Sequence, residues 1–210
     1  MTAGHVLEPH RIVPVVVLDD AGRADDLGAA LAAGGIPVAE VTFRTAAAVD
    51  VLRTLAARGD LLVGAGTVLS AAQVDVAHDA GARFVVSPGL SGDVVRRCRA
   101  LGLTVLPGTS TASDLIHALD LGIDTVKFFP AEASGGLPMI DALAAAFTQV
   151  RFVPTGGITA ESAPDYLAHP AVAAVGGSWM LPKDLVDQGR WDEVVARCAA
   201  TVAALAAGAR

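Results

Sequence analysis

The stretch Thr125-Val126-Lys127-Phe128-Phe129-Pro130 sets one lysine inside a short apolar run. β-Branched and aromatic residues in such a run predict a buried strand, in which Thr125, Lys127 and Phe129 share one face and apolar neighbours surround the amine. Burial disfavours the charged form of an amine, and a neutral amine is what attacks a ketone to form an imine. A lone strand lysine is more often an ion partner or a snorkelling side chain, so the rest of the chain must decide.

The composition describes an apolar, mildly acidic chain. Of its 210 residues, 53% are hydrophobic and 18% are charged, and the formal net charge is −7. This is enough apolar material for one large core, and we expect a single domain over residues 1–210. Without a long basic run, nucleic acid is not an expected partner, although a local site can still bind a phosphorylated substrate.

The N-terminal segment, the lengths of the apolar runs and the cysteines lead us to expect a cytoplasmic protein. The first ten residues lack the form of a signal peptide, and no apolar run reaches the length of a membrane span. Cys98 and Cys198 both lie in helical patterns. We expect two buried thiols in a reducing compartment, while the sequence alone leaves a disulfide between them open.

Apolar runs alternate with amphipathic, alanine-rich stretches along the chain. The expected strands are Ile12–Leu18, Pro37–Phe43, Leu61–Ala65, Phe84–Ser87, Thr104–Pro107, Thr125–Phe129, Arg151–Pro154 and Val172–Val175. The expected helices are Ala24–Ala33, Ala46–Ala57, Ala71–Ala80, Gly92–Ala100, Ala112–Leu121, Pro138–Phe147, Ala160–Ala168, Lys183–Gln188 and Trp191–Ala207. This alternation predicts an α/β protein with a parallel sheet, and eight units favour a closed (β/α)8 TIM barrel. An open doubly wound sheet would need a glycine-rich fingerprint after the first strand, where the chain has Asp19-Asp20-Ala21-Gly22.

Polar and small residues gather where the expected strands end. In a barrel these positions form one rim, which is where barrel enzymes place their chemistry. Glu40 would point into the apolar barrel, so it is either the ion partner of Lys127 or a proton carrier. Arg44, at the end of the same strand, either binds a carboxylate with two hydrogen bonds or forms a surface salt bridge.

Two glycine pairs follow the last two expected strands. Gly156-Gly157 comes after Thr155, and Gly176-Gly177 precedes Ser178. This is the usual phosphate-binding place in a barrel, because glycines let backbone N–H groups approach an anion and a following helix start adds its dipole. The five histidines show no metal-ligand spacing, so we expect no metal site and no cofactor.

A known family carries the same motifs in the same order. The matching stretches are Glu40–Thr45, Gly64–Leu69, Ser87–Leu90, Pro107–Thr111, Lys127–Glu132, Pro154–Ile158 and Gly176–Trp179. In these stretches the chain resembles the 2-keto-3-deoxy-6-phosphogluconate (KDPG) aldolases, also called 4-hydroxy-2-oxoglutarate (KHG) aldolases, which are class I, Schiff-base enzymes. The resemblance implies a barrel that is typically a homotrimer and that cleaves KDPG reversibly to pyruvate and glyceraldehyde 3-phosphate.

The resemblance also implies a role for each matching residue. Lys127 would form the imine and Glu40 would transfer protons. The contacts expected with substrate are Arg44 and Thr67 to its carboxylate, Pro88 and Phe129 around the pyruvyl group, Thr155 to hydroxyl groups, and Gly156, Gly157, Gly177 and Ser178 to phosphate. The segment before Ile12 is short for the family, so we expect a reduced helix at the barrel bottom.

Two kinds of rival function remain. One is a different substrate, either KHG or the galactonate epimer of KDPG, because a few hydroxyl contacts decide the stereochemistry at C4. The other is a non-catalytic phosphosugar-binding barrel, which would keep the glycine pairs. Such a barrel has no use for both Glu40 and Lys127, so their joint presence favours the enzyme.

Overall fold

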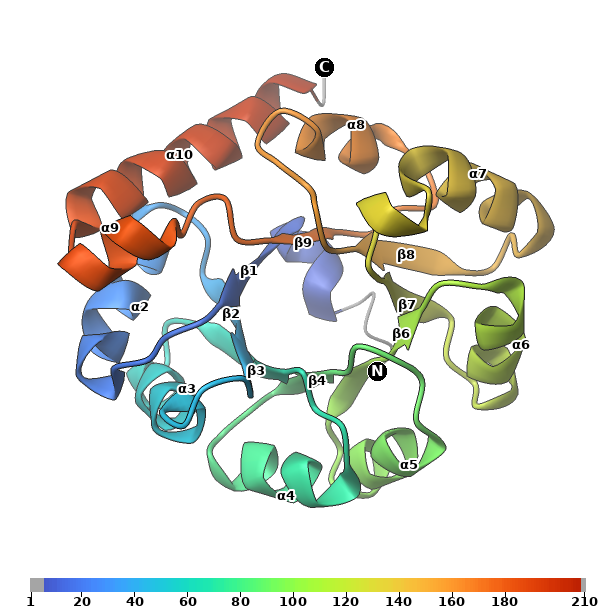
Figure 1. Ribbon diagram of the computed structural model, residues 1–210, viewed down its shortest axis with the longest axis horizontal. Coiled ribbons are helices and arrows are strands. Elements are labelled where there is room, and N and C mark those ends of the chain that lie inside the picture. The colour runs from blue at the N-terminus through green and yellow to red at the C-terminus, as the bar shows by residue number, and fades with distance from the viewer. Residues whose placement is uncertain (1–5, 209–210) are drawn as a thin grey trace.

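A computed structural model describes residues 6–208 and shows a ring of parallel strands inside a ring of helices (Figure 1). The strands are β1 (Ile12–Val16), β2 (Val38–Thr42), β3 (Leu62–Gly66), β4 (Phe84–Val86), β5 (Thr104–Leu106), β6 (Gly108–Thr109), β7 (Thr125–Phe128), β8 (Arg151–Pro154) and β9 (Val175–Gly177). The helices are η1 (Glu8–His10), η2 (Ala21–Arg23), α2 (Ala24–Ala33), α3 (Ala48–Arg58), α4 (Ala71–Asp79), α5 (Gly92–Ala100), α6 (Ala112–Asp120), η3 (Glu132–Ser134), α7 (Gly136–Ala146), α8 (Ala163–Ala168), α9 (Lys183–Gln188) and α10 (Trp191–Gly208).

The ring closes at two junctions. The strands run in the orders β5-β4-β3-β2-β1-β9 and β6-β7-β8. Pro107 separates β5 from β6, because proline has no N–H to donate, but its carbonyl still accepts a hydrogen bond from the Lys127 N–H at 2.9 Å. On the other side, isolated bridges join Phe152 to Val172 and Thr155 to Gly176. The β5–β6 pair therefore acts as one broken strand, and the expected (β/α)8 barrel is confirmed.

The helices follow the amphipathic pattern of the sequence. In α3 the buried positions Ala48, Val51, Leu52 and Leu55 recur at helical spacing and face the strands. Hydroxyl groups at the N-caps accept hydrogen bonds from backbone N–H groups of the first turn, each worth about 1 kcal/mol. These caps are Ser70 on α4, Ser91 on α5 and Thr111 on α6.

The last strand differs from the expected one. It runs from Val175 to Gly177, not from Val172 to Val175, and both of its glycines pair with β1. A Cβ atom at Gly176 would overlap the side chain of Thr155, and one at Gly177 would overlap the ring of Trp179. These glycines are therefore required by close packing within a strand, which a Gly-Gly pair in sequence does not reveal.

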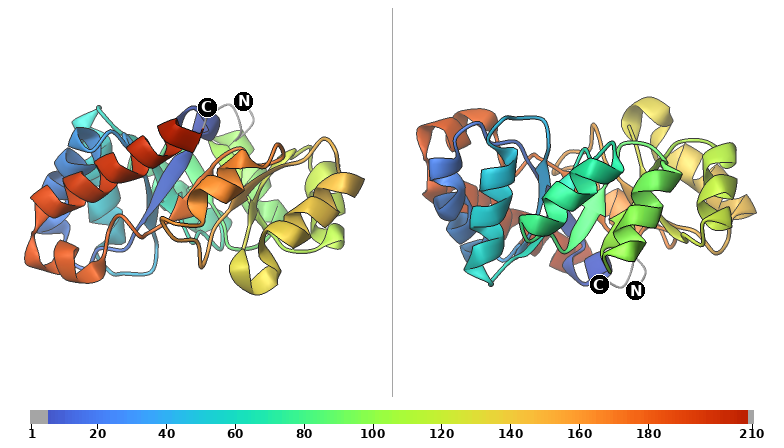
Figure 2. Two further views of the ribbon diagram at one scale, coloured as in Figure 1. Left: turned by 90° about the horizontal axis from the view of Figure 1, so that it is seen from above. Right: turned by 90° about the horizontal axis from the view of Figure 1, so that it is seen from below.

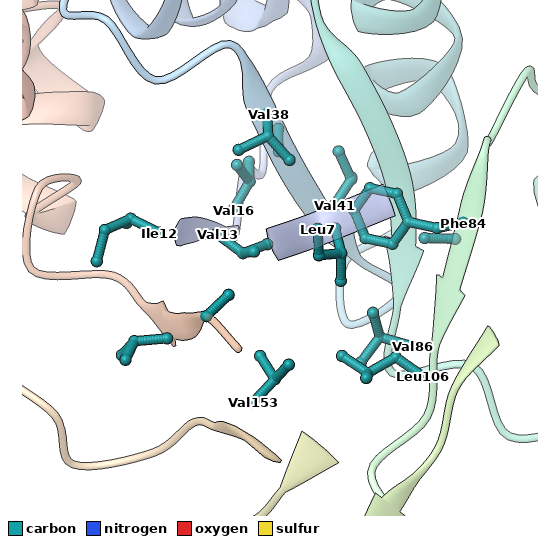
Figure 3. Packing of buried hydrophobic residues seen from close by; sticks show 14 of the residues in the cluster. Leu7, Ile12, Val13, Val16, Val38, Val41, Phe84, Val86, Leu106 and Val153 are labelled. Atoms are coloured by element: carbon teal, nitrogen blue, oxygen red, sulfur yellow. The ribbon is translucent and has the colours of Figure 1, made fainter. Parts of the chain in front are cut away.

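The lower half of the barrel is filled with apolar side chains. Val13 on β1, Phe84 and Val86 on β4, Leu106 on β5 and Val153 on β8 point toward the barrel axis (Figure 3). Leu7 lies among them and is fully buried. The segment before Ile12 thus closes the bottom with a short helical stretch at residues 6–10, while the rest of the expected reduced helix lies outside the described residues.

The closed bottom leaves the opposite face for a site. Seen from the side, η3 projects from the face opposite the N-terminal helical segment (Figure 2). The C-terminal ends of all strands reach that face, since the strands are parallel. Within residues 6–208, none of the helices is both long enough and apolar enough to cross a bilayer.

Candidate active site

A pocket of about 290 Å³ opens at the C-terminal ends of the strands. Its lining consists of Val15, Glu40, Thr42, Arg44, Thr67, Pro88, Lys127, Phe129, Thr155, Gly156, Gly157, Ile158, Gly177 and Ser178. Every residue that the sequence singled out for catalysis or substrate contact is in this set. The barrel therefore gathers motifs that lie as much as 138 positions apart in the chain.

The floor of the pocket holds a buried amine–carboxylate pair. The Lys127 side chain on β7 donates a hydrogen bond from Nζ to Oε1 of Glu40 on β2, across 3.3 Å. These strands lie on opposite sides of the barrel, and Lys127 and Glu40 are only 5% and 2% exposed. Such a pair, shielded from bulk water, has the components for imine formation with coupled proton transfer.

Strand alternation sets which neighbours surround the amine. The Phe129 ring lies on the Lys127 face, with its centroid 5.0 Å from Nζ. Phe128 points outward and packs edge-to-face against Phe152, with centroids 6.3 Å apart. The expectation that every apolar neighbour in this stretch surrounds the amine is thus wrong for Phe128, which belongs to the layer between sheet and helices.

Small residues make room for the carboxylate on the neighbouring strand. A Cβ atom at Gly66 would lie 2.6 Å from Glu40 Cγ and would overlap its carboxylate. The next residue, Thr67, has a φ of 59°, a left-handed conformation that is unusual for a β-branched side chain and costs on the order of 1–3 kcal/mol. Strain of this kind persists where the surrounding structure fixes it, here with Thr67 on the pocket wall.

Arg44 lies exposed at the mouth of the pocket. Its guanidinium makes no ion pair or side-chain hydrogen bond within residues 6–208, so the surface salt bridge that its position also allowed is not formed there. An unpaired guanidinium at a pocket mouth is available to an incoming carboxylate, which it binds with two parallel hydrogen bonds.

The first glycine pair forms a turn at the same mouth. Gly156 and Gly157 have φ values of 102° and 83°, which side chains rarely adopt. Among the described residues, no acceptor takes a hydrogen bond from the N–H groups of Gly157 and Ser178. The expected helix dipole is absent from this turn, because α8 begins only at Ala163 and is six residues long. Any anion here depends on backbone N–H groups and the Ser178 hydroxyl.

Three lining residues were not predicted from the sequence. Val15 and Thr42 face the pocket because β1 and β2 alternate, and Ile158 follows the glycine turn. The Thr42 hydroxyl donates to the carbonyl of Val16 at 2.9 Å, which ties β2 to β1 beneath the mouth. The strand alternation that predicts an inward-pointing Glu40 also places Thr42 on the same face of β2. The position of Thr42 in the pocket could therefore have been predicted from the sequence.

A larger groove, of about 730 Å³, lies at the opposite, N-terminal end of the strands. Its charged residues include Arg53 and Asp60, which are engaged in surface salt bridges with Asp50 and Arg58. It contains no buried amine or carboxylate, so we assign the chemistry to the smaller pocket.

No other cluster in the described part of the chain offers metal or thiol chemistry. Residues 6–208 contain no group of three histidine, cysteine, aspartate or glutamate side chains that could hold a metal ion. Cys98 and Cys198 are free, buried thiols. Burial raises the pKa of Cys98 to about 12 and that of Cys198 to about 11, so both stay protonated near neutral pH.

Comparison with known proteins agrees with the geometry. The family model for KDPG and KHG aldolases matches residues 4–197. The chain is 48% identical to a 2-dehydro-3-deoxy-phosphogluconate aldolase of Haemophilus influenzae, over 88% of this chain and 87% of that protein. It is 42% identical to a KHG/KDPG aldolase of Escherichia coli, over 92% and 91% of the two chains.

A solved structure gives the same result. The KDPG aldolase of Legionella pneumophila superposes with a TM-score of 0.92 at 39% identity, over 96% of this chain and 98% of that one. That structure holds pyruvate captured as a covalent carbinolamine intermediate. The resemblance of the motifs is confirmed: this chain belongs to the KDPG and KHG aldolase family of carbon–carbon lyases.

Proposed function

We propose that this protein cleaves KDPG reversibly to pyruvate and glyceraldehyde 3-phosphate through an imine on Lys127. The observation that carries the proposal is the buried Lys127–Glu40 pair at the floor of a pocket whose mouth offers an arginine and free backbone N–H groups. The covalent pyruvate adduct in the Legionella relative supports it, because a carbinolamine is the precursor of an imine.

The proposed mechanism uses Lys127 as the nucleophile and Glu40 as the proton carrier. Lys127 Nζ attacks the C2 ketone, and the carbinolamine loses water to give a protonated imine. This cation accepts the electron pair when the C3–C4 bond breaks, while Glu40 takes the C4 hydroxyl proton through a water. Glyceraldehyde 3-phosphate leaves, Glu40 returns a proton to C3 of the enamine, and hydrolysis releases pyruvate. The 3.3 Å separation of Nζ and Oε1 keeps base and reacting carbons within one small space.

The remaining lining residues would bind the rest of the substrate. Arg44 and the Thr67 hydroxyl bind the C1 carboxylate, and Thr155 contacts hydroxyl groups. Pro88 and Phe129 enclose the pyruvyl part, which matches the place of the Phe129 ring beside Nζ. Gly156, Gly157, Gly177 and Ser178 receive the phosphate at the mouth. Each charged end of the substrate would thus meet hydrogen-bond donors of the pocket.

Substrate choice is tested by measuring pyruvate release from KDPG, KHG and the galactonate epimer of KDPG. We expect the highest kcat/KM for KDPG. The E. coli relative is named for both KHG and KDPG, so KHG is the second candidate. A higher kcat/KM for KHG, or for the galactonate epimer, would replace KDPG as the substrate. Absence of turnover with all three would favour a non-catalytic phosphosugar-binding barrel.

Three further properties belong to the same proposal. The imine supplies the electron sink that a Lewis-acid metal would otherwise provide, so activity survives exhaustive treatment with EDTA. The protein is a homotrimer, measurable as mass by light scattering after size exclusion. It works in the cytoplasm, which cell fractionation would check. Its partners there are a small phosphorylated keto acid and pyruvate.

A further inference from the structure

Glu132 and Tyr166 form a contact behind the glycine turn, outside the pocket lining. The Tyr166 hydroxyl, on α8, donates a 2.5 Å hydrogen bond to Oε1 of Glu132, on η3. Tyr166 is only 2% exposed. Burial, and then the hydrogen bond to Glu132, raise the pKa of the phenol, so it remains a donor through the neutral range.

The Glu132 side chain lies directly against Gly157. A Cβ atom at Gly157 would lie 2.6 Å from Glu132 Cγ and 2.7 Å from its Cβ. The backbones are joined as well, because the Glu132 N–H donates to the Gly156 carbonyl at 3.1 Å. One face of the turn is thus formed by Glu132, while the other face opens to the pocket.

Space around the contact is restricted on its other side. Gly136 has a φ of 59°, and a Cβ atom there would lie 3.1 Å from the Tyr166 hydroxyl and 3.7 Å from Glu132 Oε2. A larger residue would press on both partners. The Tyr166 hydroxyl thus holds the Glu132 carboxylate, while Cβ and Cγ of Glu132 pack against the Gly156–Gly157 turn.

From these contacts we infer that Glu132, fixed by Tyr166, is a positioning residue that holds the Gly156–Gly157 turn in its anion-binding conformation and so sets the preference for a phosphorylated substrate. The inference rests on the proposed role of that turn. It also explains why a carboxylate is tolerated near an expected dianion. The tyrosine hydroxyl holds the charge behind the turn, and a released Glu132 could swing toward the phosphate and repel it.

Tyr166→Phe tests the inference, because it removes one hydroxyl and keeps the ring. We expect KM for KDPG to rise about tenfold, since the lost bond to the charged Glu132 carboxylate is worth about a factor of ten or more. We expect kcat to stay within about twofold of wild type. Cleavage of KHG, which carries no phosphate, should change by less than about twofold, and borohydride trapping of pyruvate should be unaffected.

Variants of Glu132 distinguish the effect of its contact with Tyr166 from the effect of its negative charge. Glu132→Gln keeps an oxygen that accepts from Tyr166, so the ratio of kcat/KM for KDPG to that for KHG should stay within about twofold of wild type, or rise. Glu132→Ala should lower the ratio as Tyr166→Phe does. The double variant Tyr166→Phe with Glu132→Ala should show no further loss, because both changes remove one contact.

Thr125→Val is the matched control. Its hydroxyl also donates to a carboxylate, that of Asp124 at 3.1 Å, but at the N-terminal end of β7. This variant should lower the melting temperature without changing the substrate ratio. If Tyr166→Phe behaves in the same way, or if Glu132→Gln loses as much as Glu132→Ala, the inference is wrong.

A parallel Gly157→Val variant distinguishes this failure from that of the proposed function. If Gly157→Val shifts the ratio and Tyr166→Phe does not, the turn binds phosphate and only the role of Glu132 and Tyr166 falls. If neither variant shifts the ratio, the turn does not recognise phosphate and both proposals fall.

Discussion

The two ends of the pocket are built in different ways. At the floor, Lys127 and Glu40 are buried side chains fixed by strands on opposite sides of the barrel. At the mouth, Gly157 and Ser178 are exposed and offer backbone N–H groups from segments that follow the strands. Exclusion of water strengthens electrostatic effects at the floor, while the mouth stays accessible to a large dianion. Changes at the floor should therefore affect every substrate, whereas changes at Gly157 and Ser178 should affect mainly the phosphorylated one.

The largest effect is expected for Lys127→Arg. A guanidinium remains protonated and cannot attack a ketone, so cleavage of KDPG and of KHG should both fall to background. Pyruvate release from each substrate measures this. Substantial residual turnover of either one would mean that the floor amine is not the nucleophile.

Glu40→Gln should give the next largest effect. The amide keeps the size of the side chain but removes the base, so turnover of both substrates should fall on the order of 10²–10⁴-fold. Imine formation, followed by borohydride trapping, should persist at a lower rate. Near-normal turnover would assign Glu40 to a purely ionic role beside Lys127.

Gly157→Val moves the change to the mouth. A side chain there would be strained at a φ of 83° and would meet Glu132. We expect a strong fall in kcat/KM for KDPG and a much smaller one for KHG. The ratio of the two values is the measurement, and an unchanged ratio would make KHG the better candidate for the natural substrate.

Ser178→Ala should be the mildest change. Loss of one hydrogen bond to a charged phosphate, worth about 1.5–3 kcal/mol, should lower the same ratio by about 10- to 150-fold. Steady-state kinetics with both substrates would detect it. An equal loss with KHG would place Ser178 near the reacting carbons instead of the phosphate.

The sequence predicted the barrel and the membership of the pocket well. Periodicity located every strand but the last, and alternation placed Lys127 beside Phe129 and Glu40 inside the barrel, because both features depend on local geometry. It did not distinguish Gly156-Gly157, which needs left-handed backbone, from Gly176-Gly177, which needs space for a neighbouring side chain. That difference arises from contacts between distant segments.

Two further features of the site could not be predicted from the sequence. The strained conformation of Thr67 is a backbone property with no signature in a β-branched residue. Nothing in the sequence indicated a role for Glu132, because its partner Tyr166 lies 34 positions away on a helix. The residues that do the proposed chemistry were thus easier to find than those that hold the turn beside them.

The covalent step at the floor is tested most directly by trapping it. The protein is incubated with saturating pyruvate and sodium borohydride, and the digested product is weighed by mass spectrometry. Because a reduced imine is stable, we expect loss of activity together with the mass of one reduced pyruvyl group on Lys127 and on no other lysine. Unmodified Lys127 under these conditions would contradict the imine mechanism.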